Sequence, residues 1–153
     1  MPNLFPQNME FEYEEKSIED LEEPLEFKGS YLFDFEKGEF VKNPDGTIAK
    51  SNDLEAYVQW CNKTMYSPRY KLAYSDLYGQ EFNKLIGTLL SKDAIELEIK
   101  RMTEETLIVH PRTREITNFV FKWSDSKEEV FYEYEVITID GERFMLENSV
   151  KVR

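Results

Sequence analysis

The sequence predicts an α+β fold, with helices in the middle of the chain and an antiparallel β-meander at its C-terminal end. Two observations support this. Apolar residues recur at helical spacing between residues 52 and 106. From residue 115 onward, aromatic and β-branched residues alternate with charged ones, and an Asp-Gly pair typical of a hairpin follows. The 153 residues fit one ordinary domain. We therefore expect a single domain over residues 29–153, preceded by an arm over residues 1–28.

The expected arm is acidic. Nine acidic residues and a single lysine lie between Glu10 and Glu26. Such a density of like charge favours an extended, solvated segment. An alternative is an arm that settles on a basic partner, with apolar residues as anchors. These residues are Leu4, Phe5, Phe11 and Tyr13.

A small hairpin and a helix are expected next. The segment YLFDF, residues 31–35, has the composition of a strand, EKGE forms a turn, and FVK resumes the strand. Residues 43–47, NPDGT, have the composition of a second turn. Asn52 can cap a helix with Glu55 as its capping-box partner, and Pro68 prevents continuation of that helix. Its apolar positions are Leu54, Val58, Cys61 and Met65.

Two further helices are predicted before the meander. The first has about three turns, and Gly87 favours an early C-terminal end. The second begins at Ser91, a good N-cap, and ends before Pro111. The apolar positions of the first helix are Phe82, Leu85, Ile86 and Leu89, and those of the second are Ile95, Ile99, Met102 and Thr106.

The meander is predicted to have three strands. Residues 115–123 and 129–139 form the first two, separated by the polar turn SDSKE. Asp140-Gly141 predicts a two-residue turn, after which residues 142–152 pair back. Alternation places one set of side chains of the middle strand on the same face. These are Val130, Tyr132, Tyr134 and Val136.

Composition excludes several classes of function. The formal net charge of −12 disfavours nucleic-acid binding, because neutralising phosphates requires Lys and Arg. No apolar run is long enough to span a membrane, and the N-terminus lacks the features of a signal peptide. A single cysteine, Cys61, cannot form an internal disulfide and is expected to be a buried thiol. We therefore expect a soluble cytoplasmic protein that binds neither nucleic acid nor membrane.

The sequence offers no recognisable catalytic or cofactor motif. One His and one Cys give no zinc-type ligand spacing, and neither an EF-hand loop nor a glycine-rich phosphate loop occurs. A pair of carboxylates could serve a glycosidase-type peptidoglycan hydrolase, but 31 acidic residues make chance pairs plentiful. The charge also allows an acidic protein that mimics DNA. We predict no enzyme activity, no metal and no cofactor, and keep these two functions as alternatives.

Two arginine-containing segments could either stabilise the fold or contact a partner. His110 and Pro111 lie where the last helix must end, and Arg112 can donate to helix-end carbonyls or to a carboxylate. A charged His110 there would favour the helix dipole. Arg69 precedes alternating aromatics, so an internal salt bridge and an interface anchor are equally supported.

Four segments together resemble a known family. These are YLFDFEKGEF at 31–40, LEAYVQWC at 54–61, SPRYKLAYSDLYGQE at 67–81 and EETLIVHPRTREITNF at 104–119. In this order they are similar to the baseplate wedge or sheath-initiator proteins of contractile phage tails, in the branch found in defective Bacillus prophages and clostridial tail particles. That family carries a Glu-Pro-Arg signature after its last helix. Here His110 replaces the glutamate, which removes any contact that needs this carboxylate.

The resemblance implies a fold and a role. Such proteins are similar to the small interlocking domain of the sheath subunit, and six copies surround the tail tube and join the baseplate wedge to the first sheath ring. The implied location is a phage or phage-tail-like particle assembled in the host cytoplasm. The implied partners are wedge proteins, the sheath subunit, and tube or hub proteins.

Two sets of contact residues are predicted from this role. An exposed sheet edge can accept a strand from a sheath subunit through main-chain hydrogen bonds. The expected acceptor residues are Phe119, Phe121, Trp123, Tyr132, Tyr134 and Val136, in strands 115–123 and 129–139. The residues expected to face wedge proteins are Arg69, Tyr70, Tyr74, His110, Pro111 and Arg112.

Overall fold

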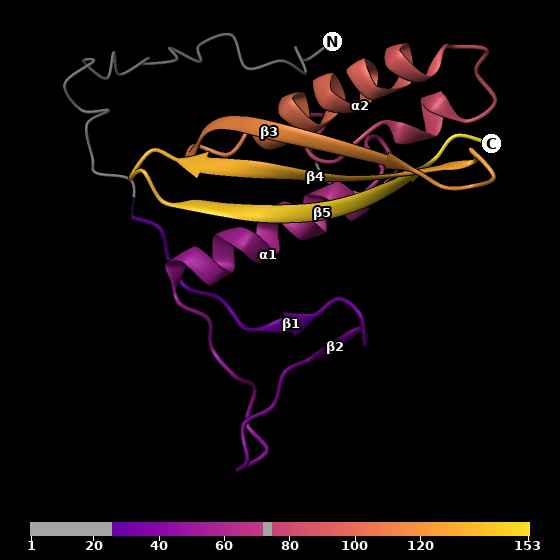
Figure 1. Ribbon diagram of the computed structural model, residues 1–153. Helices are drawn as coiled ribbons and strands as arrows, with labels where there is room; N and C mark the ends of the chain where they lie inside the picture. Colours follow the sequence, from indigo (N-terminus) through magenta and orange to yellow (C-terminus); the bar gives the residue numbers. More distant parts are fainter. Residues whose placement is uncertain (1–25, 72–74) are drawn as a thin grey trace, which may run out of the picture.

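The computed structural model describes residues 26–71 and 75–153. A three-stranded antiparallel sheet forms its centre, in the order β3 (Thr113–Trp123), β4 (Glu129–Thr138) and β5 (Arg143–Lys151). Two helices accompany the sheet, α1 (Asp53–Tyr66) along β5 and α2 (Lys92–Leu107) along β3 (Figure 1). A two-stranded hairpin, β1 (Phe33–Asp34) and β2 (Glu39–Phe40), extends beside α1 (Figure 1). The predicted α+β class and C-terminal meander are confirmed.

Both helices pack on one face of the sheet. Thr103 of α2 hydrogen-bonds to the hydroxyl of Tyr132, and Tyr57 of α1 packs edge-on against Phe144. The predicted face of β4 is buried, with its four named side chains at most 2% exposed. The alternate residues Phe131 and Glu133 are exposed, as the two-residue period of a strand requires. The result is a two-layer arrangement with an open outer sheet face.

The helix signals in the sequence correspond to real caps. Asn52 and Glu55 form the predicted capping box, and Ser91 accepts a hydrogen bond from the Ala94 amide. Cys61 is fully buried, as expected. These caps satisfy amide groups that have no partner within the helix, so they define where α1 and α2 begin.

The predicted three-turn second helix is wrong. Only a four-residue 3-10 helix, η2 (Phe82–Leu85), forms there. Phe82 and Leu85 are buried, but Ile86 is 50% exposed and Leu89 is fully exposed. Ile86 is already extended and Gly87 has a φ of 74°, so the chain leaves the helix after one turn. The apolar spacing that indicated a longer helix includes two residues that do not join the core.

The turn between β4 and β5 has three residues rather than the predicted two. The amide of Thr138 donates to the carbonyl of Glu142, which leaves residues 139–141 as the loop. Gly141 occupies the left-handed position with a φ of 84°. Three-residue hairpins use a left-handed glycine at this place, so the Asp-Gly signal correctly located the hairpin.

Gly79 provides a test of this architecture. Its φ is 98°, and a Cβ there would lie 2.6 Å from the backbone oxygen of Ser67. We expect Gly79→Ala to lower the free energy of unfolding by about 2 kcal/mol or more. Gly87→Ala is the matched control, because Gly87 has a similar φ but open space around it. Equal losses in urea unfolding of the two variants would contradict the close packing at Gly79.

Candidate functional site

The side chain of Arg112 joins three parts of the fold that are distant in sequence. It is 3% exposed and donates to Glu142 at 2.8 Å and to Asp53 at 3.3 Å. Asp140 lies 3.8 Å away in the same β4–β5 turn. Asp53 is the first residue of α1. One guanidinium therefore ties the beginning of α1 to the β4–β5 turn, directly before β3 starts.

Aromatic rings surround the same guanidinium. The Arg112 guanidinium carbon lies 4.9 Å from the centre of the Phe27 ring and 5.7 Å from that of Tyr57. Such contacts attract a cation to the electron-rich ring face. The Tyr57 hydroxyl contacts Thr113 Oγ1 at 2.6 Å, and Thr113 Oγ1 donates to the carbonyl of Leu107 at 2.6 Å. This network holds the end of α2 against α1.

His110 is a half-buried ring at the corner where the end of α2, the start of α1 and the start of β3 meet. Its Nδ1 accepts a hydrogen bond from the Arg112 amide at 3.1 Å, and its ring centre lies 4.5 Å from that of Trp60. Burial, followed by the nearby Arg112 charge, lowers the pKa of His110 below its ordinary value. A charged His110, which the expected helix-dipole stabilisation requires, is therefore less favourable here than it would be at an exposed position. The ring contributes packing and one accepted hydrogen bond.

Arg69 makes the internal salt bridge that was one of its two predicted roles. Its Nε donates to the carbonyl of Gly79 at 3.0 Å, and its terminal nitrogen donates to Glu105 of α2 at 2.8 Å. Burial lowers the pKa of Arg69, but the hydrogen bond and charge of Glu105 outweigh it and raise that pKa overall. The side chain is 6% exposed, so little of it is accessible to a partner.

The remaining residues predicted to face the wedge lie in different environments. Tyr70 is 65% exposed, with a φ of 65°, and Pro111 is exposed beside the buried Arg112. Tyr74 lies outside the described residues. The structure therefore brings His110, Pro111 and Arg112 together at one corner and places Arg69 in a separate ion pair on α2.

The predicted acceptor residues divide between an edge strand and the central strand. Phe119, Phe121 and Trp123 lie on β3, at the edge, whereas Tyr132, Tyr134 and Val136 lie on β4, in the middle. Both sides of β4 are already paired, with β3 and with β5. The expectation that β4 frames an acceptor edge is therefore wrong, and its three residues belong to the core.

The two edges of the sheet differ in regularity. The β3–β4 register shifts twice, between Thr113 and Glu115 and between Thr117 and Val120, and Asn118 has a φ of 54°. Such bulges disrupt the ladder and blunt an edge. The β4–β5 register is continuous over nine pairs from residue 143 to residue 151. Within the described residues, β5 is thus the regular edge.

The alternation of hydrogen bonds along β5 shows which of its backbone groups point away from β4. The pairs Thr138–Glu142 and Glu128–Val152 are hydrogen-bonded, and the register is continuous between them. Even-numbered residues of β5 therefore bond to β4, because hydrogen bonds alternate along an antiparallel pair. The amides and carbonyls of Met145, Glu147 and Ser149 point to the free side. Strand pairing in the described part leaves the three amides open, and the Glu147 carbonyl accepts a hydrogen bond from the Asn148 side chain at 2.8 Å.

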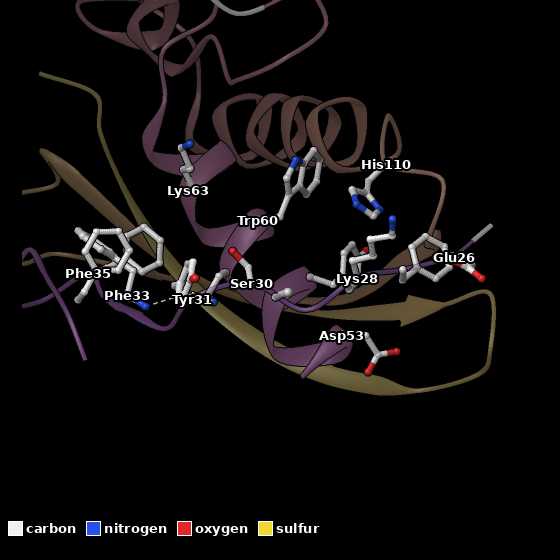
Figure 2. A pocket seen from close by; sticks show the side chains of 15 residues that line it. Glu26, Lys28, Ser30, Tyr31, Phe33, Phe35, Asp53, Trp60, Lys63 and His110 are labelled. Atoms are coloured by element: carbon white, nitrogen blue, oxygen red, sulfur yellow. Dashed lines mark hydrogen bonds between the residues drawn. The ribbon is translucent and has the colours of Figure 1, made fainter. Parts of the chain in front are cut away.

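A groove lined by aromatic side chains, which the sequence reasoning missed, runs along α1. It has a volume of about 720 Å³. Figure 2 shows Phe33 and Phe35 at one end, Trp60 in the middle, and His110 with Lys28 at the other end. The aromatic residues of YLFDF were the available signal. Their pattern predicts a hairpin, and only the fold places them opposite α1.

The described residues were compared with the requirements of a metal site, a reactive thiol and a membrane span. No group of three His, Cys, Asp or Glu residues in the described part of the chain could hold a metal ion. Burial raises the pKa of the Cys61 thiol to about 12, so little thiolate is present at neutral pH. No described helix is long and apolar enough to cross a membrane.

A family model described as contractile injection system sheath initiator matches residues 29–141. The chain belongs to this family. The match covers most of the chain and includes α1, residues 110–112 and β4. It confirms the resemblance seen in the sequence, and with it the coarse prediction of a structural component of a contractile tail baseplate.

Comparison with solved structures adds a similar fold. A Geobacter sulfurreducens protein, provisionally described as a tail lysozyme, superposes with a TM-score of 0.56 at 14% identity, covering 67% of this chain and 94% of that one. A chain of the anti-feeding prophage baseplate, solved by cryo-EM with six-fold symmetry, gives a TM-score of 0.49 at 12% identity, with 82% and 87% covered. No curated protein sequence matches the chain.

In this sheath initiator, the buried Arg112 should contribute more to the free energy of unfolding than the exposed Arg101. Arg112→Ala removes two hydrogen bonds and the aromatic contacts from a buried side chain. We expect the free energy of unfolding to fall by about 2–4 kcal/mol. Arg101→Ala is the control, because Arg101 also pairs with two carboxylates but is 53% exposed. It should cost less than about 1 kcal/mol. Similar urea midpoints for the two variants would contradict this assignment.

His110 predicts a pH dependence of stability. Its pKa is lower in the folded than in the unfolded protein, so the unfolded state binds more protons as the pH falls. The wild type should therefore lose stability on acidification through the ordinary histidine range, from about pH 7 to about pH 5. His110→Gln should show a smaller loss over this range. Parallel pH profiles of the two proteins, measured by urea unfolding, would rule out this role.

Proposed function

We propose that this protein joins the baseplate wedge to the first sheath ring of a contractile tail and starts sheath assembly by accepting a sheath strand. The main support for this proposal is the sheath-initiator family match over residues 29–141. The regular, open edge of β5 supports it, because an extended chain can add to such an edge through main-chain hydrogen bonds. No part of this role requires catalysis, so we propose that the protein is not an enzyme.

The acceptor edge in this proposal is β5. An added strand would meet the outward amides of Met145, Glu147 and Ser149 at this edge, and it would displace the Asn148 side chain from the Glu147 carbonyl. The β3 edge is a poorer acceptor, because its bulges interrupt the spacing of its hydrogen-bonding groups. This changes the predicted acceptor set: Phe119, Phe121 and Trp123 lie on the irregular edge, and the β4 residues shape the core beneath the sheet.

The wedge-facing surface in this proposal is the corner around His110. Pro111 at this corner is exposed and can contact a partner directly, and the buried Arg112 would fix the shape of the corner. Tyr70 is also exposed but lies next to the separate Arg69 ion pair, where the buried Arg69 would fix the local shape. We propose wedge proteins as partners here, and tube or hub proteins as further neighbours. In this proposal the particle assembles in the host cytoplasm and holds six copies of the protein per baseplate. The copy number would follow from the symmetry of the particle rather than from self-association.

The distribution of charge weighs against the acidic DNA-mimic alternative. Residues 1–25 contain eight acidic residues and one lysine, a formal charge of −7 out of −12. The remaining residues carry −5, with 23 acidic and 18 basic residues. A protein that imitates DNA needs regularly spaced negative charge on its folded surface. The described residues instead mix both signs, as in the Arg101–Glu98–Glu105 cluster on α2. No observation favours the hydrolase alternative.

A backbone substitution tests the edge proposal. Glu147→Pro removes an outward amide of β5 while leaving the hydrogen bonds to β4 in place. Expressed in a strain that lacks the gene, this variant should give tubes and baseplates without sheath in electron micrographs. Glu147→Ala, which keeps the amide, should restore sheathed tails. Normal tails from Glu147→Pro, with an unchanged circular dichroism spectrum, would exclude β5 as the acceptor. Normal tails without the gene would overturn the proposed function itself.

A further inference from the structure

The aromatic groove beside α1 is long enough to hold an extended segment of chain. Phe33 and Phe35 lie at one end, and Trp60 forms part of the wall (Figure 2). Phe27 also lines the groove, and its ring centre lies 6.1 Å from that of His110. The groove follows α1 from Asp53 to Lys63, a distance of about 15 Å at the rise of an α-helix. A segment of about five extended residues would fill that length.

The chain itself contains a segment of matching pattern. Residues 9–14 read MEFEYE, in which Met9, Phe11 and Tyr13 alternate with three glutamates. In an extended segment this alternation places the three apolar side chains on one side and the carboxylates on the other. Its length and apolar spacing match the groove, and its carboxylates would lie at the rim, where Lys28 and Lys63 contribute to the lining.

The point at which the described chain begins favours the same occupant. Residue 26 already lines the groove, and the next residue, Phe27, packs over the Arg112 guanidinium. Twelve residues lie between Tyr13 and Glu26. Such a connection can span up to about 40 Å when extended, more than twice the length of the groove. The segment therefore can reach every part of the groove within one molecule.

We propose that residues 9–14 bind in the aromatic groove of their own chain as an extended segment, with Met9, Phe11 and Tyr13 against Trp60, Phe33 and Phe35. In this arrangement the acidic N-terminal region covers the apolar surface that leads to the His110 corner. This intramolecular contact does not depend on the proposed function.

A spin-label experiment on the full chain tests the contact. A nitroxide on Glu10→Cys lies on the acidic side of the segment, and the fully buried Cys61 will not react with the label. In ¹H–¹⁵N spectra we expect the strongest line broadening at the Ala56 amide and the Trp60 indole. The amide of Asp125, in the β3–β4 turn, is the internal reference. Broadening at the groove no greater than at Asp125 would overturn the proposal.

Variants on both sides of the contact make the test specific. Phe11→Ser with Tyr13→Ser should reduce the broadening at the groove to the level of Asp125. Glu12→Gln with Glu14→Gln, which keeps the apolar side, should retain it. Ala56→Arg should also reduce it by filling the groove with a residue that α1 tolerates. Retention of the broadening in either the serine or the arginine variant would place the segment elsewhere and overturn the proposal.

A mixing experiment separates the molecule's own segment from that of another copy. Spin-labelled protein without ¹⁵N is mixed with ¹⁵N-labelled protein without the spin label. Broadening that is absent from the mixture supports binding within one chain, and broadening that persists in it overturns that arrangement in favour of a second copy. Both results concern the protein in solution, so neither affects the outcome expected for Glu147→Pro in assembled tails.

Discussion

The position of the Arg112 guanidinium constrains most of the fold. It is buried where α1 begins, where the β4–β5 turn reverses and where β3 starts, and carboxylates from two of these elements bind it. A buried cation is stable only when its charge is compensated. Asp53 and Glu142 are half-exposed, so each remains solvated while it neutralises the arginine. Burial, followed by this charge, lowers the pKa of His110, whose ring packs against Trp60.

This corner also explains why the sheet can remain open at β5. Side-chain contacts at the inner face of the sheet and at Arg112 hold α1 and α2 in place. The helices therefore do not need to pack over the β5 edge. An uncovered edge is normally an aggregation risk. Here Arg143, Glu147 and Lys151 place charges of both signs along it, which discourages pairing between identical copies and still permits a complementary strand.

Sequence reasoning located the features that depend on local chemistry. The caps at Asn52 and Ser91, the buried face of β4 and the hairpin at Gly141 follow from hydrogen bonding and alternation within a few residues. The short η2 helix and the central position of β4 could not be obtained in this way, because they depend on which distant segments pair. The groove was missed for the same reason: Phe27, Phe33, Trp60 and His110 meet only after α1 packs.

Different groups of this protein therefore maintain its fold and contact its partners. Buried arginines and stacked aromatics fix the corner and the sheet, and they use groups that a partner cannot reach. The groups left accessible are backbone atoms on β5 and aromatic rings in the groove, which bind through geometry and apolar area. These backbone groups and aromatic rings carry no net charge, so they select a partner by its shape and hydrogen-bonding pattern rather than by long-range attraction. A component that must start assembly at one place on a particle benefits from this selectivity.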